Sequence, residues 1–250
     1  MPIALLTDFG TRDPYVAAMK GVLATRTNVA VHDLTHEIAP FDVLGGAWFL
    51  KTVARFWPAG TIFICVIDPG VGTARNIVAL EESGRIFLAP DNGLLTFVFS
   101  GGRAFSVTNA SLFLPDDSRT FHGRDRFAPV GAALANGLPL EEVGPPLAHI
   151  AMLRYEPPSY GEIVRGTIVA VDRFGNVITD IDASRIPFAP YALHARDLVI
   201  DRLELTYGDA APGPFLIVGS AGCIEISIAN TSAAERLHLR RLERVEVRPL

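Results

Sequence analysis

Three side chains in the first half of the chain carry a charge or can transfer a proton, and their positions suit a functional site. Asp68 directly follows the most apolar strand-like run, and the glycine-rich residues 69–74 can fold Arg75 back beside it. A carboxylate and a guanidinium at a strand end form a charge-assisted pair. His122 precedes a predicted helix, in a loop that exposes a side chain yet holds its neighbours. Plainer roles also fit: the pair can steady a turn, and the histidine can be a base, a ligand or a surface residue.

Other polar residues also follow strand-like runs. Asp8 ends the first run, where a carboxylate can accept both hydroxyls of a ribose or cap the following turn. Residues 91–93, Asp-Asn-Gly, fit a tight turn without any ligand. Residues 172–176 and 219–222 are glycine-containing loops, which hairpins or bulges explain but which could also hold a zwitterion and the amide edge of a purine. Together these residues indicate an enzyme with a carboxylate-rich cleft.

An α/β arrangement is needed to bring these residues together. From residue 1 to about 150, short apolar runs alternate with helix-like stretches, which is typical of α/β layers. The pattern predicts strands over residues 3–6, 30–31, 61–67, 77–80, 86–88 and 104–107, and helices over 14–23, 42–56 and 125–136. Ligands of open α/β sheets bind outside the carboxyl ends of strands, so the polar turns point to one shared site.

The second part of the chain has a different sequence pattern. Two prolines within residues 155–160 indicate a linker. Beyond them, short β-branched runs cover residues 162–171, 176–181, 198–200, 203–205, 215–218, 224–228 and 245–247. We therefore expect an α/β protein with a sandwich-like N-terminal α/β domain over residues 1–154 and a small, mainly antiparallel C-terminal β domain over residues 161–250.

Composition excludes several classes of protein. With 49% hydrophobic and 20% charged residues, the chain is a globule rather than a disordered or low-complexity segment. A net charge of −5 argues against binding nucleic acid through its phosphates or binding a membrane surface. No apolar run approaches the roughly 20 residues that span a bilayer, and residues 1–8 do not begin a signal peptide. Cys65 and Cys223 lie in separate apolar runs, as expected for buried thiols of a cytoplasmic protein.

The motifs together resemble one family, the S-adenosylmethionine (SAM) hydroxide adenosyltransferases, which are related to fluorinating and chlorinating enzymes that attack the same substrate. The matching segments run in order over nearly the whole chain. They are LTDFG (6–10), IAPFDV (38–43), VIDPGVGTAR (66–75), PDNG (90–93), FHGRD (121–125), DRFGN (172–176) and GSAG (219–222).

The resemblance implies hydrolysis of SAM to adenosine and methionine, with neither metal nor cofactor. It also implies a homotrimer that binds substrate between the N-terminal domain of one subunit and the C-terminal domain of the next. By motif position, the water-activating triad falls on Asp68, Arg75 and His122.

The resemblance also carries substrate-binding roles onto seven positions. They are Asp8 for the ribose hydroxyls, Phe41 and Phe121 for apolar walls, Asp172 and Ser220 for the methionine amino and carboxylate groups, Asn176 for adenine, and Glu225 in the same C-terminal segment.

Departures from the halogenating relatives favour water as the nucleophile. Those enzymes have a tyrosine where Asp68 stands and lack a histidine matching His122, and the fluorinating members place a serine where Gly123 stands. A carboxylate beside the nucleophile repels halide and orients water. Whether Asp68 or His122 takes the proton is left open.

Two other functions remain as alternatives. A metal-dependent nucleoside or phosphoester hydrolase would use hard ligands at the strand ends, namely Asp8, Asp68, Asp91, Asn92 and His122. A SAM or adenosine sensor would use the same pocket without turnover. Chelator sensitivity separates the first alternative, and substrate turnover separates the second.

Overall fold

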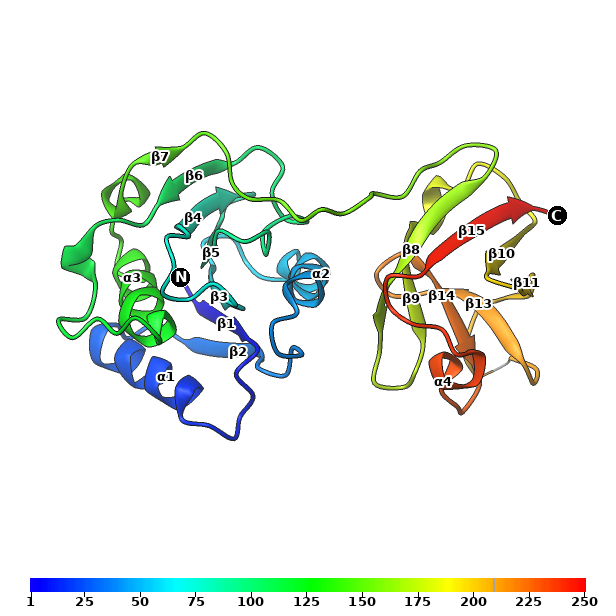
Figure 1. Ribbon diagram of the computed structural model, residues 1–250, viewed down its shortest axis with the longest axis horizontal. Coiled ribbons are helices and arrows are strands. Elements are labelled where there is room, and N and C mark those ends of the chain that lie inside the picture. Colours follow the sequence, from blue (N-terminus) through cyan, green and yellow to red (C-terminus); the bar gives the residue numbers. More distant parts are fainter. Residues whose placement is uncertain (209) are drawn as a thin grey trace. The chain divides into compact units, whose positions relative to one another are not determined.

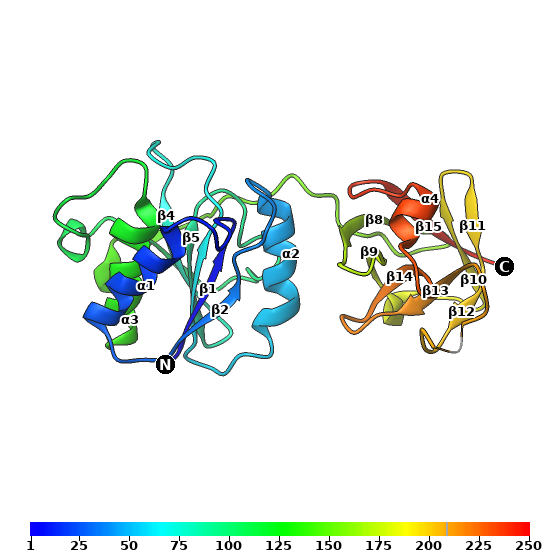
Figure 2. The ribbon, with the colours of Figure 1, turned by 90° about the horizontal axis from the view of Figure 1, so that it is seen from below.

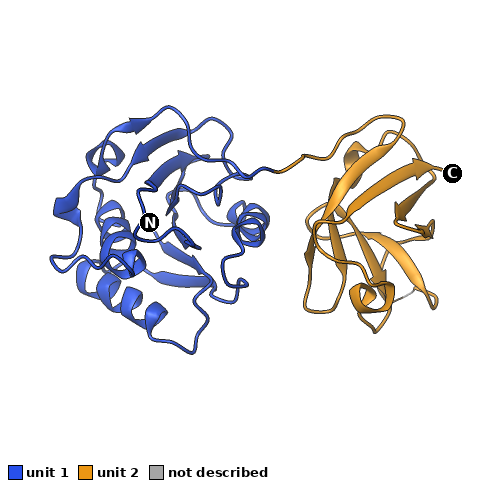
Figure 3. Cartoon of the chain, in the orientation of Figure 1, with its two compact units in different colours: residues 1–154 blue, residues 155–250 orange. Residues whose placement is uncertain are grey.

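The chain divides into two compact units in the computed structural model, which describes residues 1–208 and 210–250. Unit 1 is Met1–Arg154 and unit 2 is Tyr155–Leu250 (Figure 3). Unit 1 mixes helices with a sheet, whereas unit 2 is mostly sheet. The expected fold class, an α/β domain followed by a mainly antiparallel β domain, is confirmed.

A seven-stranded sheet forms the centre of unit 1, in the order β2-β1-β3-β5-β4-β6-β7. Its strands are β1 (Ile3–Thr7), β2 (Val31–Thr35), β3 (Ile62–Val66), β4 (Ile77–Glu82), β5 (Arg85–Pro90), β6 (Arg103–Ser106) and β7 (Pro146–Leu147). The four strands from β2 to β5 pair in parallel, and the pairs from β5 to β7 are antiparallel. Strands β1 and β3 are buried at every residue, as continuous apolar runs in parallel sheets usually are.

The edge strand β2 is longer than the sequence pattern predicts. The pattern indicated residues 30–31, but the strand covers Val31–Thr35 and contains His32 and Asp33. Because β2 lies at the sheet edge and is only partly buried, its residues carry little hydrophobic signal.

Helices cover both faces of this sheet (Figure 2). Helices α1 (Tyr15–Arg26) and α3 (Ala128–Ala135) lie on one face, and α2 (Val43–Ala54) lies on the other. Each face has its own apolar core, because alternate residues of β1 point to opposite sides. A π-helical turn, Gly123–Phe127, leads into α3, so the expected helix over residues 125–136 begins irregularly. Short 3₁₀ turns cover Ala110–Leu112 and Leu140–Val143.

Unit 2 is an eight-stranded sheet in the order β11-β10-β15-β8-β9-β14-β13-β12. Most of these strands are labelled in Figure 1. Its strands are β8 (Val164–Val171), β9 (Val177–Asp182), β10 (Tyr191–Ala195), β11 (Leu198–Ile200), β12 (Leu203–Glu204), β13 (Pro214–Val218), β14 (Cys223–Ile228) and β15 (Arg244–Pro249). Among the described strands of unit 2, only β12 and β13 pair in parallel, and the sheet curls so that β11 contacts β13.

Two elements of unit 2 are absent from the sequence-based prediction. Strand β10 has the sequence Tyr-Ala-Leu-His-Ala, which lacks β-branched residues, and it is held by pairing with β15 and β11. The short helix α4 (Ala233–Leu237) begins at Ser232, whose hydroxyl accepts a hydrogen bond from the Glu235 amide. A further 3₁₀ turn covers Ala183–Arg185. Within the described parts of both units, none of the helices has the length and apolar character required to cross a bilayer.

The residues that the sequence presents as a linker, 155–160, are bonded to unit 2. The Tyr155 hydroxyl donates to the buried carboxylate of Asp180, which also accepts the Thr167 amide at 2.7 Å. Ser159 exchanges two backbone hydrogen bonds of 3.0 Å with Arg165. These contacts attach the segment around its two prolines to the β domain.

Candidate active site

Two carboxylates lie at the carboxyl ends of adjacent parallel strands in unit 1. Thr7 and Val66 are register partners at the ends of β1 and β3, and Asp8 and Asp68 follow them in the chain. Both carboxylates line a cavity of about 440 Å³. Phe41, Phe121 and His122 line the same cavity, so five residues predicted from the sequence meet there. This is the sheet edge at which open α/β sheets bind ligands.

Arg75 connects Asp68 to His122. Its Nε donates to Asp68 Oδ1 at 2.9 Å and to Oδ2 at 3.0 Å, and its terminal nitrogen also contacts Oδ2. The same terminal nitrogen lies 2.9 Å from Nδ1 of His122. The side chains of Arg75 and Asp68 are only 10% and 5% exposed, so solvent screens the pair little. The three residues expected to act together form one continuous chain of contacts.

The glycine-rich loop after β3 allows this pairing. The Val71 amide donates to the Asp68 carbonyl, and the Thr73 amide donates to the Gly70 carbonyl, which closes two successive turns. Gly72 has a φ of +79°, and a Cβ there would lie 2.5 Å from the carbonyl oxygen of Arg119. A side chain at position 72 would therefore push this loop away from the segment that carries His122.

The contact with Arg75 determines which nitrogen of His122 carries a proton. A guanidinium only donates hydrogen bonds, so Nδ1 must accept, and the neutral ring has its proton on Nε2. Nε2 is buried and has no hydrogen-bond partner among residues 1–208 and 210–250. Burial, together with the positive charges of Arg126 and Arg75, lowers the pKa of His122 below its ordinary value. The ring is thus neutral near pH 7, with Nδ1 engaged by Arg75.

Asp8 has one oxygen held by the backbone. Its Oδ2 accepts a hydrogen bond of 2.8 Å from the Phe41 amide. Phe41 adopts a φ of +67°, an uncommon conformation for a residue with a side chain. Burial raises the pKa of Asp8, an effect that the Phe41 hydrogen bond opposes and the nearby charge of Asp68 reinforces. The carboxylate retains lone pairs for two donors from a ligand.

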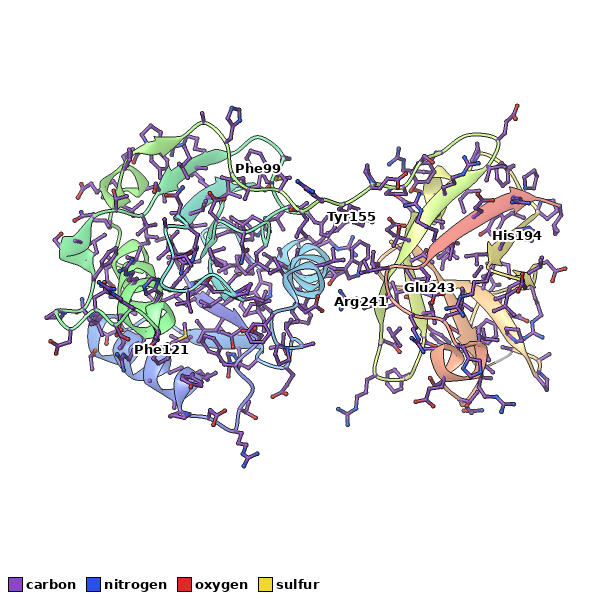
Figure 4. All side chains as sticks on the ribbon, viewed as in Figure 1. Phe99, Phe121, Tyr155, His194, Arg241 and Glu243 are labelled. Atoms are coloured by element: carbon purple, nitrogen blue, oxygen red, sulfur yellow. The ribbon has the colours of Figure 1, made fainter. Side chains whose placement is uncertain are left out.

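Aromatic side chains line one side of this cavity. Phe121, labelled in Figure 4, packs with Phe9 at 6.1 Å and with Tyr15 at 5.1 Å between ring centroids. Phe9 and Tyr15 are also 5.6 Å apart and line the cavity themselves. Sequence reasoning named Phe121 but not its two partners, although both stand within seven residues of Asp8.

Ion pairs that the sequence analysis did not predict hold the loop before His122. Asp117 accepts hydrogen bonds from the guanidinium of Arg126, including one of 2.9 Å from Nε. Asp125 is fully buried and accepts the Ser118 amide at 2.9 Å and the Arg124 Nε at 2.6 Å. The π-helical turn therefore anchors the loop at two points.

Unit 2 contains its own cavity, of about 740 Å³. Asp172 and Asn176 line it and bond to each other, since Asp172 Oδ2 accepts Asn176 Nδ2 at 2.9 Å. Asp172 Oδ1 also accepts the amides of Phe174 and Asn176, at 2.9 and 2.8 Å. The side chain of Phe174 is 78% exposed at the same cavity, so an apolar ring is available to a ligand.

Ser220 and Glu225 lie on the β13–β14 hairpin. Ser220 is in its turn, and Glu225 is on β14 with only 6% of its surface exposed. Glu225 Oε2 accepts a hydrogen bond of 2.8 Å from the hydroxyl of Tyr207, which lines the cavity. Burial raises the pKa of Glu225. Sequence reasoning missed Tyr207, which stands three residues after β12 and carries no motif signal.

In the described portion of the chain, no group of three or more His, Cys, Asp or Glu side chains is arranged to hold a metal ion.

Known proteins resemble the chain over both units. Residues 3–144 match the N-terminal domain model of the SAM hydroxide adenosyltransferases, and residues 166–246 match the C-terminal domain model. A protein of Salinispora tropica named (R)-S-adenosyl-L-methionine hydrolase is 37% identical, with 98% of this chain and 97% of that protein covered. A protein of the same name from Thermus thermophilus is 39% identical, with 96% of both chains covered.

A solved structure, that of an uncharacterised conserved protein from Thermotoga maritima, superposes with a TM-score of 0.92. It is 33% identical, with 98% of this chain and 99% of that one covered. Two domain models that match nearly the whole chain in order, together with relatives of this identity, establish that the chain belongs to the SAM hydroxide adenosyltransferase family.

Proposed function

We propose that this protein hydrolyses SAM to adenosine and L-methionine by attack of water on C5′ of the ribose, without a metal or a cofactor. The observation that carries the proposal is the buried chain of Asp68, Arg75 and His122, which lies at the same sheet edge as Asp8. The names of the relatives further support the (R) epimer at sulfur as substrate.

The chemistry requires little more than a positioned water. The water oxygen forms a bond to C5′ as the C5′–S bond breaks. The electron pair of the C5′–S bond stays on sulfur, which leaves as the neutral thioether of methionine. No general acid is needed, because the leaving group departs without a charge. The water gives up a proton, and base assistance of this kind is typically worth about 10²–10⁴-fold.

We assign the base to Asp68 rather than His122. The Nδ1 lone pair of His122 is engaged by Arg75 and its Nε2 carries the proton, so the ring has no free acceptor. Asp68 Oδ1 accepts only from Nε of Arg75 and so retains a lone pair for a water hydrogen, whereas Oδ2 already accepts from two nitrogens. In this assignment His122 orients Arg75, and Arg75 orients Asp68 and stabilises the developing hydroxide. The negative charge of Asp68 also disfavours halide at the nucleophile position.

The substrate contacts divide between the two units. In unit 1, Asp8 accepts hydrogen bonds from the ribose hydroxyls, and Phe41 and Phe121 form apolar walls. These walls keep bulk solvent out of the site, which favours the reaction because the positive charge of the sulfonium is neutralised as the C5′–S bond breaks. In unit 2, Asp172 and Ser220 bind the methionine amino and carboxylate groups.

Two further residues complete the half-site in unit 2. Asn176 binds adenine through the acceptor oxygen that its contact with Asp172 leaves open. Glu225 acts through Tyr207, which it holds at the cavity.

We also propose a homotrimer in which the half-site of unit 1 in one subunit and the half-site of unit 2 in the next share one substrate. Each unit has a cavity lined by a different part of the expected contact set, which supports a site built from two units. A cytoplasmic location is part of the proposal and is supported by the buried thiol of Cys65.

The test is turnover of SAM in ¹⁸O-labelled water with excess chelator. Adenosine labelled on its 5′ oxygen, formed together with methionine, is the expected result. Loss of turnover on chelation, with restoration by a divalent cation, would point instead to a metal-dependent hydrolase. Tight SAM binding without any product would point to a sensor.

A further inference from the structure

A buried histidine outside the cavity contacts the strand end that carries Asp8. His36 follows β2, is 5% exposed, and places Nδ1 at 2.8 Å from the hydroxyl of Thr7. Thr7 is fully buried and immediately precedes Asp8 in the chain. His36 therefore reaches the backbone of the carboxylate without lying in the cavity.

His36 holds this strand end through its backbone as well as its ring. The Gly10 amide donates to the His36 carbonyl at 2.7 Å. The Phe9 amide donates to Thr7 Oγ1 at 3.3 Å, so the hydroxyl that contacts His36 also closes the turn around Asp8. Residues on both sides of Asp8 are thus attached to His36.

The ring of His36 is oriented from its other side. Its Nε2 lies 3.0 Å from Asp33 Oδ1, and Lys20 donates to Asp33 Oδ2 at 2.6 Å. Nε2 is within ion-pair distance of Asp33 but makes no aligned hydrogen bond among the described residues. The nearby carboxylate favours a proton on Nε2, and in that neutral ring Nδ1 accepts from the Thr7 hydroxyl. Lys20 and Asp33 are 40% and 42% exposed, so this outer pair is weak beside the buried contact of His36 with Thr7.

An irregularity in β2 precedes this arrangement. Leu5 pairs with Asp33 and Leu6 pairs with Thr35, so Leu34 is an extra residue relative to β1. Such a bulge changes the direction in which the following side chains point and is common next to functional sites.

We propose that His36 is a positioning residue, which holds the ribose-binding carboxylate of Asp8 in place through the hydroxyl of Thr7. The inference rests on the function proposed above, in which Asp8 accepts the ribose hydroxyls. The carboxylate of Asp8 is fixed by the Phe41 amide, and the backbone of Asp8 is fixed by the turn that His36 holds through Thr7. Without His36, Asp8 keeps its carboxylate, but the carboxylate is no longer fixed in the position from which it accepts the ribose hydroxyl hydrogen bonds.

The test compares ligands with and without the ribose 2′-hydroxyl. Binding of adenosine and 2′-deoxyadenosine is measured by calorimetry, and turnover is measured with SAM and 2′-deoxy-SAM. In the parent protein, loss of one hydrogen bond to a carboxylate should weaken binding about 10- to 100-fold. This discrimination ratio, rather than activity alone, reports on the position of Asp8.

Two substitutions of His36 separate its two ring nitrogens. In His36→Asn, an amide group replaces Nδ1 and can still reach Thr7, whereas in His36→Gln the amide replaces Nε2 and reaches only toward Asp33. We expect His36→Gln to reduce the discrimination ratio at least about fivefold, because the hydrogen bond that places Asp8 is lost. We expect His36→Asn to keep most of it. His32→Asn is the matched control and should equal the parent, because His32 lies on β2 with its ring edge-on to Trp57.

A second pair of variants tests the same contact if the histidine variants fold poorly. Thr7→Val removes the hydroxyl at nearly constant volume and should reproduce His36→Gln, whereas Thr7→Ser keeps the hydroxyl and should retain the ratio. Equal losses for both ligands in His36→Gln and Thr7→Val would overturn the proposal and leave these residues a purely structural role.

The experiment also separates this inference from the proposed function. No SAM turnover by the parent would refute the hydrolase, while the two nucleosides would still measure the effect of His36 on Asp8. A parent that binds both nucleosides equally would refute the contact of Asp8 with ribose and, with it, the role of His36.

Discussion

Replacing Arg75 by lysine and by methionine separates the geometry of its guanidinium from its charge. Arg75 donates through Nε and a terminal nitrogen to Asp68, and through that terminal nitrogen to His122. A lysine ammonium keeps the charge but is a single point donor that does not reproduce this planar fork. Methionine removes both the fork and the charge at similar length.

The contacts set the expected magnitudes. Losing one charge-assisted hydrogen bond, worth about 1.5–3 kcal/mol, slows turnover about 10- to 150-fold if it is felt in full at the transition state. We expect Arg75→Lys to lower kcat within this range, and Arg75→Met to lower it about 10²–10⁴-fold as the aligned base is lost. Arg75→Met also leaves Asp68 buried without its partner, which costs about 3–5 kcal/mol of stability.

The pH profile distinguishes the two variants further. The charge of Arg75 is one of the causes that lower the pKa of His122. This pKa should therefore rise in Arg75→Met and stay near its parent value in Arg75→Lys, as followed by NMR titration of the ring.

The assay is steady-state hydrolysis of SAM by the purified full chain, with thermal unfolding measured in parallel. Arg103 is the matched control. Its Nε and a terminal nitrogen donate to Glu81 Oε2 at 2.9 and 2.6 Å, but its side chain is 59% exposed and is not among the residues that line the unit 1 cavity. Arg103→Lys should retain parental kcat. Full activity in Arg75→Lys, or an unchanged His122 pKa in Arg75→Met, would refute the reasoning.

Three other predictions concern Asp8, acidity and assembly. Asp8→Asn should raise KM for SAM about 10-fold or more while kcat falls less, because an amide cannot accept both ribose hydroxyls as a carboxylate does; unchanged affinity by titration would remove Asp8 from the site. On acidification, kcat/KM should fall as pH drops through the pKa of His122, which lies below its ordinary 6.5, because protonation occupies the nitrogen that accepts from Arg75; a limb centred above pH 7 would contradict this. Asp68→Asn damages the half-site of unit 1 and Asp172→Ala that of unit 2, so each variant should be nearly inactive alone. When the two variants are co-expressed, about one quarter of the parental activity should return, because about one random pairing of neighbouring subunits in four joins two intact half-sites. No recovery would place both halves of the site in one subunit.

Local spacing accounts for the parts of the site that could be predicted. Asp68 and Arg75 are seven residues apart, and the glycine-rich turn between them leaves few ways for the loop to close. Asp172 and Asn176 likewise meet across a five-residue turn. Such contacts depend on neighbouring residues, so their types and order indicate them in advance.

Contacts between distant segments could not be predicted in this way. His122 is 47 residues from Arg75, and only the packing of the π-helical turn beside the Asp68 loop brings Nδ1 to the guanidinium. That contact also assigns the proton on the ring, which leaves Asp68 as the base in our proposal. The anchoring of Asp117 by Arg126 and the support of Tyr207 by Glu225 arise in the same manner.

The sequence by itself determined the α/β-plus-β architecture, because alternation of apolar runs and turns is a local property of the chain. It also determined the order of the motifs that place the chain in its family. The tertiary structure decided which side chains act on one another: His36 is 29 residues from Thr7, and only the pairing of β2 with β1 turns a remote histidine toward the strand end of Asp8. The sequence gives the type of each side chain, but the distances between side chains that form a site depend on how separate helices and strands pack.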